Sequence, residues 1–329
     1  MSSAELIERG DLDELTRHVD RLCAARDWDG LVDLRDRCRA ALARGRQLWP
    51  IASNTEYRIA LEAPGPWAAR MLEPGLGHLA LGPMPEVAAS THTWAELRDH
   101  IDATPPAAIA AHERVVRGED LSGDAVATEL PTLLDLPLVL APWEPGYPLA
   151  EYLAGEARFP DPPHPMLRDA TLPGPSVVER VEDADTTRAL VDLASAWTTE
   201  SNGRAEAIAV GGDALDALAG LGLRQARLAE VAPADALATM AWAAASGGAH
   251  GRRRGMASGR FGAWWAAAAL TGLLDAWPVE PDELGDAVAE LRWYRFDTGE
   301  PETGWSLRVA IEDPADGYAW AVSATDARF

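Results

Sequence analysis

No carboxylate side chain occurs between Asp235 and Asp275, although the whole chain carries a formal net charge of -23. The same stretch contains three consecutive arginines, residues 252–254, between Gly251 and Gly255. Because an unpaired carboxylate is costly to bury, an acid-free stretch in an acidic chain predicts two buried helices joined by a basic loop. The arginines and glycines are also suited to binding an anion. The sequence leaves both interpretations open.

The composition predicts a soluble globular protein of more than one subdomain, because 329 residues exceed the usual span of a single hydrophobic core. All 29 basic residues are arginine, which excludes Schiff-base chemistry and a P-loop lysine. The acidic balance argues against a nucleic-acid partner, since such binding depends on clustered basic residues. The longest apolar stretch, residues 261–274, is too short to span a bilayer, so no membrane partner is expected.

The chain begins without an apolar segment behind a basic leader, which favours a cytoplasmic location over secretion. Cys23 and Cys38 are its only cysteines, and both fall on apolar faces of predicted helices. In a reducing compartment they are expected to be small buried side chains rather than a disulfide or a metal pair.

The N-terminal part, residues 1–129, is predicted to be a stack of antiparallel helices. Apolar residues recur at helical spacing, and prolines or glycines separate the runs. Thr93 and Glu96 form the sequence pattern of a capping box at the start of one helix. The predicted elements are a helix hairpin over residues 4–46 and helices over 56–62, 67–72, 93–101 and 107–117.

The fold class is predicted to be mainly α, with an α+β part that ends in a three-stranded antiparallel meander. Residues 130–175 are rich in proline and are expected to form an irregular connection, and residues 176–329 to form the α+β subdomain. Strands are predicted at residues 177–181, 206–210 and 225–231, and helices at 186–197, 213–218, 234–245, 256–276 and 282–290. The meander combines alternating strands at 291–296, 305–311 and 318–322 with turns at 299–301 and 313–317.

The first candidate site is an anion-binding loop at the start of a helix, made of His250, Arg252, Arg253 and Arg254 together with Arg260. Backbone N–H groups at a helix N-terminus attract anions, and arginine binds carboxylate or phosphate with two hydrogen bonds. The alternative is that these arginines pair with the protein's own surplus of carboxylates. The spacing does not match a Walker motif, which also needs a lysine.

The second candidate site is an interaction surface on the terminal meander, made of Trp293, Arg295, Trp305 and Trp320. Alternate residues of a strand face opposite sides, so one face is expected to pack on helices and the other to meet a partner. Cross-strand packing of the same aromatic residues is the alternative.

Other motifs give weaker signals, and we predict no catalytic residue, no metal site and no cofactor. His92, Glu96 and His100 have ligand-like spacing. Thr93, however, is the expected N-cap, and Glu96 is expected to form the capping box with it instead of binding a metal. Residues 75–80 match a dinucleotide-binding pattern without the strand that must precede it. Asp213 follows two glycines as an N-cap between a strand and a helix.

Three stretches resemble uncharacterised proteins from high-GC bacteria: residues 47–50, residues 56–64 and the run from Trp293 to Asp313. The resemblance covers much of the chain and implies no particular activity.

The leading functional hypothesis is a protein-interaction or scaffold module, because stacked helices offer extended grooves and no reactive constellation is visible. The expected partner is another protein or a second copy of the chain. The alternative is an enzyme or sensor that binds a phosphate or nucleotide at the arginine cluster.

Overall fold

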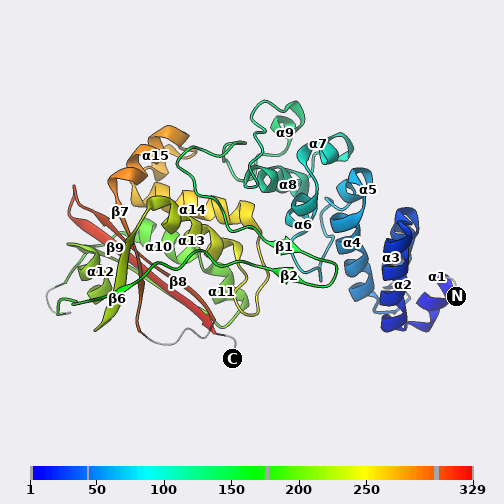
Figure 1. The fold of residues 1–329 in the computed structure, drawn as a ribbon, viewed down its shortest axis with the longest axis horizontal. Helices are drawn as coiled ribbons and strands as arrows, with labels where there is room; N and C mark the ends of the chain where they lie inside the picture. Colours follow the sequence, from blue (N-terminus) through cyan, green and yellow to red (C-terminus); the bar gives the residue numbers. More distant parts are fainter. Residues whose placement is uncertain (1–2, 43, 175–177, 300–303, 328–329) are drawn as a thin grey trace. The chain divides into compact units, whose positions relative to one another are not determined.

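The computed structural model describes residues 3–42, 44–174, 178–299 and 304–327. The chain divides into two compact units (Figure 1). Unit 1 comprises Met1–Leu133 and Leu149–Phe159, and unit 2 comprises Leu134–Pro148 and Pro160–Phe329. The chain therefore passes back and forth between the units within the proline-rich region. None of the helices in the described ranges is both long and apolar enough to cross a lipid bilayer.

Unit 1 is helical, which confirms the helical stack predicted for the N-terminal part. A short antiparallel pair of strands, β1 (Glu151–Tyr152) and β2 (Ala157–Arg158), is its only sheet among the described residues. The helices are α1 (Ser3–Arg9), α2 (Leu12–Ala25), α3 (Trp28–Leu42), α4 (Trp49–Glu62), α5 (Gly65–Ala69), α6 (Met84–Thr91), α7 (Trp94–Leu97), the 3₁₀ turn η1 (Arg98–His100), α8 (Pro105–Val115) and α9 (Ala125–Glu129).

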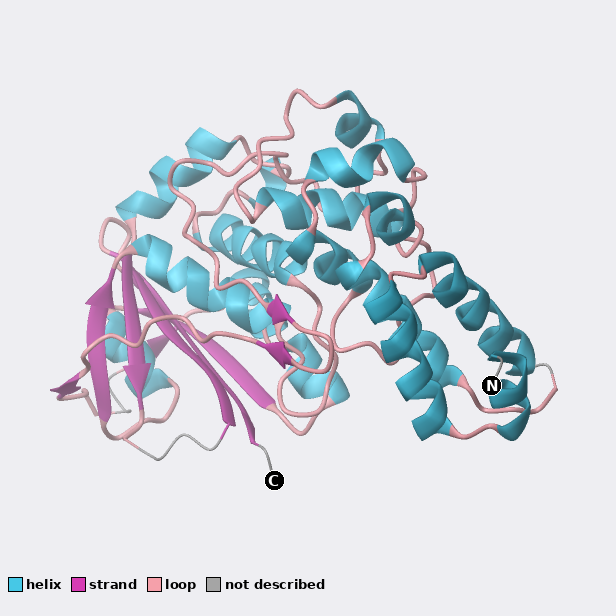
Figure 2. Cartoon of the chain, turned by 45° about the vertical axis from the view of Figure 1, so that its right-hand side comes forward, coloured by secondary structure: helices cyan, strands magenta, loops and turns pink. Residues whose placement is uncertain are grey.

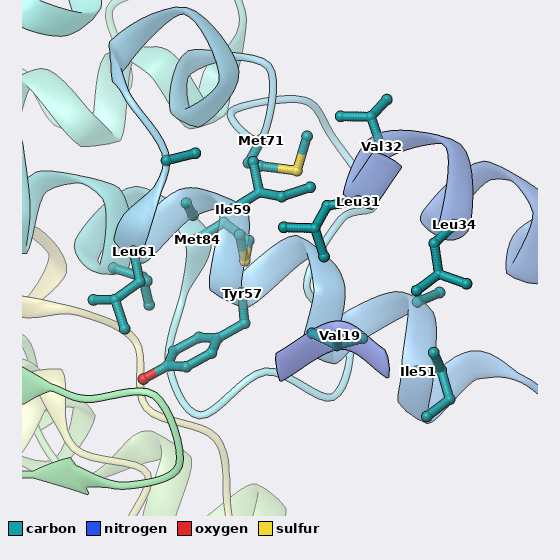
Figure 3. Packing of buried hydrophobic residues seen from close by; sticks show 14 of the residues in the cluster. Val19, Leu31, Val32, Leu34, Ile51, Tyr57, Ile59, Leu61, Met71 and Met84 are labelled. Carbon is teal, nitrogen blue, oxygen red and sulfur yellow. The ribbon is translucent and has the colours of Figure 1, made fainter. Parts of the chain in front are cut away.

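Helix α4 is the centre of unit 1, because its residues from Ile51 to Leu61 are buried apart from Asn54. Helices α2 and α3 pack one apolar face on it, and Figure 3 shows Val19, Leu31 and Leu34 close to α4 side chains. The sequence predicts only the second half of α4. Its first two turns are apolar or small on every side and lack the helical period that reveals an amphipathic helix.

The two cysteines of unit 1 are unpaired and buried, as predicted. Burial raises the pKa of the Cys23 thiol to about 11 and that of Cys38 to about 12. Both thiols therefore stay protonated at neutral pH and behave as small apolar side chains.

Unit 2 combines a sheet with helices. Its strands are β3 (Arg168–Ala170), β4 (Glu179–Arg180), β5 (Arg204–Gly211), β6 (Ala226–Val231), β7 (Arg292–Asp297), β8 (Gly304–Asp313) and β9 (Tyr318–Ala327). Its helices are α10 (Ala184–Asp192), α11 (Ser195–Glu200), α12 (Ala214–Gly220), α13 (Pro233–Ala245), α14 (Met256–Leu270), the 3₁₀ turn η2 (Leu274–Ala276) and α15 (Pro281–Glu290).

The predicted meander is confirmed and forms the middle of a seven-stranded antiparallel sheet with the order β3-β6-β7-β8-β9-β5-β4. β5 pairs with β9 over its whole length, and β6 pairs with β7. Most of the predicted turn at residues 299–301, and the first residue of the strand predicted at 177–181, lie outside the described residues.

Helices cover both faces of the sheet in unit 2 (Figure 2). Helix α12 packs on the face that carries Ile208, Ala310 and Ala321. Helices α10 and α13 pack on the other face, where Trp293 and Trp320 flank Ile311 in one cross-strand row. Asp213 caps α12 as predicted, since its side chain accepts hydrogen bonds from the first turn.

Helices α13 and α14 are the two buried helices predicted for the acid-free stretch. They pack against each other, and most residues of both are inaccessible to solvent. A Cβ atom at Gly259 would lie 2.3 Å from the carbonyl oxygen of Ala241, and one at Gly262 would lie 2.8 Å from Cβ of Ala244. The absence of side chains at these two positions therefore permits the close approach of the helices.

A buried ion pair attaches the segment 134–148 of unit 2 to α14. The side chains of Arg260 and Glu144 are both fully buried, and Arg260 donates from Nε and Nη2 to the two carboxylate oxygens at 2.7 Å each. Its remaining donors bind the carbonyl oxygens of Pro137 and Val139. Burial raises the pKa of Glu144, but the hydrogen bonds from Arg260 outweigh this effect and hold the pKa below its ordinary value.

We expect Glu144→Leu to lower the free energy of unfolding by about 3–5 kcal/mol, because it leaves a buried guanidinium without its counter-charge. Urea titration of the whole protein measures the change. Asp192→Leu is the control, since Asp192 forms an exposed pair with Arg188 at 3.7 Å. An equal, small effect of both substitutions would show that the buried pair does not hold this part of unit 2 together.

Candidate functional site

The arginine loop, residues 246–255, joins α13 to α14 and is held by two carboxylates of its own unit. Glu200, the last residue of α11, accepts hydrogen bonds from the backbone N–H of Arg252 at 3.1 Å and from Nη2 of Arg254 at 2.5 Å. Asp326 of β9 accepts from the backbone N–H of Ala249 at 2.6 Å. The hydrogen bond from Arg252 and the charge of Arg254 lower the pKa of Glu200.

The sequence left open that these arginines pair with carboxylates of the chain, and Arg254 does so with Glu200. The backbone and guanidinium donors that recommended the loop for an anion are engaged by carboxylates of the chain itself. Arg253 is half-buried and His250 is exposed at the surface of the loop.

Arg260 is separate from this loop and is not available to a ligand, contrary to its predicted place in the anion site. Its side chain, in the second turn of α14, faces the interior, where Glu144 and two carbonyl groups bind it. It also lies over the ring of Trp264, with 5.5 Å between the guanidinium carbon and the ring centroid. Arg260 is buried because it lies on a face of α14 that is turned to the interior. The charge pattern of the sequence does not show which face that is.

Two of the tryptophans predicted on an interaction surface are core residues instead. Trp293 is 1% exposed and donates to the carbonyl oxygen of Val288, and Trp320 is 7% exposed and donates to Asp183. Both belong to the cross-strand row that packs on helices, so cross-strand packing explains them. Trp305 is half-buried.

The motifs with ligand-like spacing in unit 1 serve the fold. Glu96 accepts from the backbone and hydroxyl of Thr93, which confirms the capping box. His92 is buried between the carbonyl oxygens of Ala88 and Ala63. Residues 75–80 follow no strand, and the backbone N–H of Gly77 binds the buried carboxylate of Glu56 at 2.7 Å. The described part of the chain contains no cluster of His, Cys, Asp and Glu that would hold a metal ion.

The strongest candidate site is a cleft in unit 2 where β7 and β8 separate. These strands pair only between Arg292–Arg295 and Val309–Glu312. Beyond that point Phe296 and Asp297 continue to pair with β6, while β8 pairs with β9 alone. The opening has a volume of about 620 Å³. This arginine cleft is lined by His164, Pro165, Met166, Leu167, Arg227, Arg295, Phe296, Asp297, Gly299, Ser306 and Arg308.

Three neighbouring strands each contribute one arginine to the cleft. Arg227 of β6 forms a two-point ion pair with Asp297 at 2.9 and 2.5 Å. Arg295 of β7 donates to the hydroxyl of Thr239 at 2.8 Å. The hydrogen bond from Arg227 is the main cause that lowers the pKa of Asp297, which is therefore ionised at neutral pH.

Arg308 of β8 differs from the other two arginines of the cleft. Its Nε and Nη1 atoms are inaccessible to solvent, and neither has a hydrogen-bond partner in the part of the chain that the structure describes. A buried donor without a partner is costly, and more so when it is charged. The lining residues carry three positive charges and one negative charge with His164 neutral, within an acidic protein. This arrangement is suited to holding an anion.

The family of this protein follows from a comparison of its sequence with protein-family models. The model of a family of unknown function, DUF6183, matches residues 13–327. The chain belongs to this family. The resemblance to uncharacterised proteins is thereby confirmed. No curated protein and no solved structure matches the chain.

The sequence analysis did not single out Arg227 or Arg308 of this DUF6183 member. The available signal was Arg308 itself, a charged residue in the strongly apolar alternation of β8. The two arginines are separated by more than eighty positions in the sequence, and only the pairing of β6 with β7 and β7 with β8 brings them to one cleft.

We expect Glu200→Ala to release the arginine loop, because it removes the carboxylate that binds Arg252 and Arg254. Hydrogen exchange of the backbone amides of residues 247–254 should become about tenfold faster, which corresponds to the loss of one charge-assisted hydrogen bond. Glu182→Ala, at an exposed position outside the loop, is the control. Unchanged exchange in Glu200→Ala would mean that the loop is held by other contacts.

Proposed function

We propose that this protein is a receptor for a small anionic ligand, which it binds in the arginine cleft of unit 2. The observation that carries the proposal is Arg308, which lines the open cleft and whose buried Nε and Nη1 donors have no partner among the described residues. A bound anion would supply an acceptor and a negative charge next to this guanidinium. The proposal thus takes up the anion binding of the alternative hypothesis but moves it from the arginine loop to the sheet.

The size of the cleft supports a ligand rather than a single bound water. Small-molecule sites enclose roughly 300–1,000 Å³ and combine apolar walls with a few placed polar groups. The arginine cleft falls in this range, at about 620 Å³. Its positive charge stands out in a protein with 52 acidic and 29 basic residues, so an anion would be attracted to this place more than to the surrounding surface.

A cytoplasmic location is part of the proposal. The two buried, unpaired thiols of Cys23 and Cys38 are consistent with a reducing compartment.

We expect inorganic phosphate to bind the wild-type protein and Arg308→Gln to weaken this binding at least tenfold, because a hydrogen bond to a charged group contributes about 1.5–3 kcal/mol. Isothermal titration calorimetry at low chloride concentration measures the affinity. Arg188→Gln is the matched control, since Arg188 is an exposed arginine of the same unit and lies outside the cleft. Sulfate and citrate are tested alongside phosphate.

Failure of all three anions to bind the wild-type protein would contradict the proposal. Equal binding by wild type and Arg308→Gln would place the anion elsewhere. Urea unfolding of both variants ensures that they are compared as folded proteins.

Protein binding by unit 1 is a second candidate function and continues the scaffold hypothesis. A groove of about 380 Å³ lies between α2 and α4, next to the turn between β1 and β2. Its lining includes Leu12, which is 40% exposed, and Ile51. Grooves between helices with apolar side chains accept an apolar anchor from a partner segment.

We expect a photo-reactive amino acid at Thr16, within this groove, to form a specific cross-link to a protein in extracts of the native host, and to a second copy if the partner is the chain itself. Leu12→Asp should remove most of the cross-link by placing a charge in the groove. The same photo-reactive group at Arg188 is the control. An equal yield at both positions, or one that Leu12→Asp leaves unchanged, would remove this candidate function.

A further inference from the structure

The arginine cleft is larger than an inorganic anion requires. Its volume of about 620 Å³ is several times that of a phosphate or sulfate ion, and it matches a ligand with an organic part. Its lining combines arginines of the sheet with side chains of another segment.

An apolar part of the lining comes from the segment before β3. Pro165, Met166 and Leu167 line the cleft there, and Met166 is 87% exposed. An exposed methionine is unbranched and adapts to the shape of an apolar group placed against it. The cleft thus combines arginines with an adaptable apolar surface.

The net charge of the cleft would be neutralised by a ligand that carries two negative charges. Arg227 is neutralised by Asp297, whose carboxylate also accepts from the backbone N–H of Gly299 at 2.9 Å and is fully engaged. The sum over the lining residues is then +2 with His164 neutral, from three arginines and one aspartate. A singly charged carboxylate or sulfate ester would neutralise only half of this charge.

The arginines of the cleft come from three neighbouring strands. A terminal phosphate presents three acceptor oxygens in different directions and can accept from more than one of them, whereas the two oxygens of a carboxylate lie in one plane.

We propose that the arginine cleft binds a phosphomonoester, with its doubly charged phosphate at Arg308 between β7 and β8 and its organic group against Pro165, Met166 and Leu167. This inference rests on the proposed function and specifies the chemical class of its ligand. The phosphate accepts from the guanidinium of Arg308, and the organic group covers the exposed side chain of Met166.

The experiment compares phenyl phosphate with phenyl sulfate, which has nearly the same shape but a single charge at every pH. Phenyl phosphate loses its second proton near pH 6, so its affinity should rise about tenfold between pH 5 and pH 7.5. Phenyl sulfate should bind more weakly at pH 7.5 and gain nothing over this range. Calorimetric titration of the full-length protein gives both affinities.

His164 and Asp297 are the other titratable side chains that line the cleft, and their effects have to be separated from that of the ligand. Asp297 is already ionised at pH 5, because its pKa is lowered. His164→Gln removes the imidazole from the lining, so the rise for phenyl phosphate measured in this variant belongs to the ligand.

The organic group is tested by a second comparison. Phenyl phosphate should bind about fivefold more tightly than inorganic phosphate, from roughly 40 Å² of apolar surface removed from water. Met166→Ser should reduce this advantage and leave the affinity for inorganic phosphate unchanged. Arg308→Gln should weaken both ligands.

The outcomes separate this inference from the proposed function. If phenyl sulfate binds as tightly as phenyl phosphate at pH 7.5 and depends on Arg308, the cleft is an anion site but the phosphomonoester is wrong. A flat pH profile for phenyl phosphate in His164→Gln would overturn the inference in the same way. If none of these anions binds, the proposed function itself fails.

Discussion

The close packing of α13 against α14 is the constraint on which the structure of unit 2 depends. Gly259 and Gly262 bring the two helices so near that a side chain at either position would collide with α13. Helix α13 in turn packs on β7 and β8, and α14 packs on α10. An unpaired carboxylate on these inner surfaces would have to be desolvated, which explains why the stretch between Asp235 and Asp275 contains none.

Arg260 carries a charge into this interior, where a charge is tolerated only with a partner. Arg260 is accompanied by Glu144, and its other donors bind the carbonyl oxygens of Pro137 and Val139. The buried ion pair fixes the irregular segment 134–148, whose proline-rich sequence has few backbone hydrogen bonds of its own. The arginine loop follows the same rule at the surface, where Glu200 and Asp326 bind its donors.

Arg308 is the exception to this pairing. Arg254, Arg260 and Arg227 each have a carboxylate of the chain within ion-pair distance. At Arg308 two buried donors are left without an acceptor among the described residues. The separation of β7 from β8 opens the cleft that Arg308 lines.

The sequence by itself determined the elements with a strong local signal. The capping box of Thr93 and Glu96, the cap of Asp213, the buried helices of the acid-free stretch and the antiparallel meander each follow from a pattern within one continuous stretch of the sequence. Where the local signal is weak, the prediction was incomplete: the first turns of α4 have no amphipathic period, and the helix predicted at residues 186–197 is divided into α10 and α11.

Only the tertiary structure decided which charges are paired and where a ligand has space. The partner of Arg260 lies 116 positions away, and the burial of Trp293 and Trp320 depends on which face of the sheet the helices cover. The cleft depends on three strands whose pairing joins residues from distant parts of the chain. Ion pairing and burial are set by distances in space, and an amino-acid pattern fixes such distances only within one helix, strand or turn.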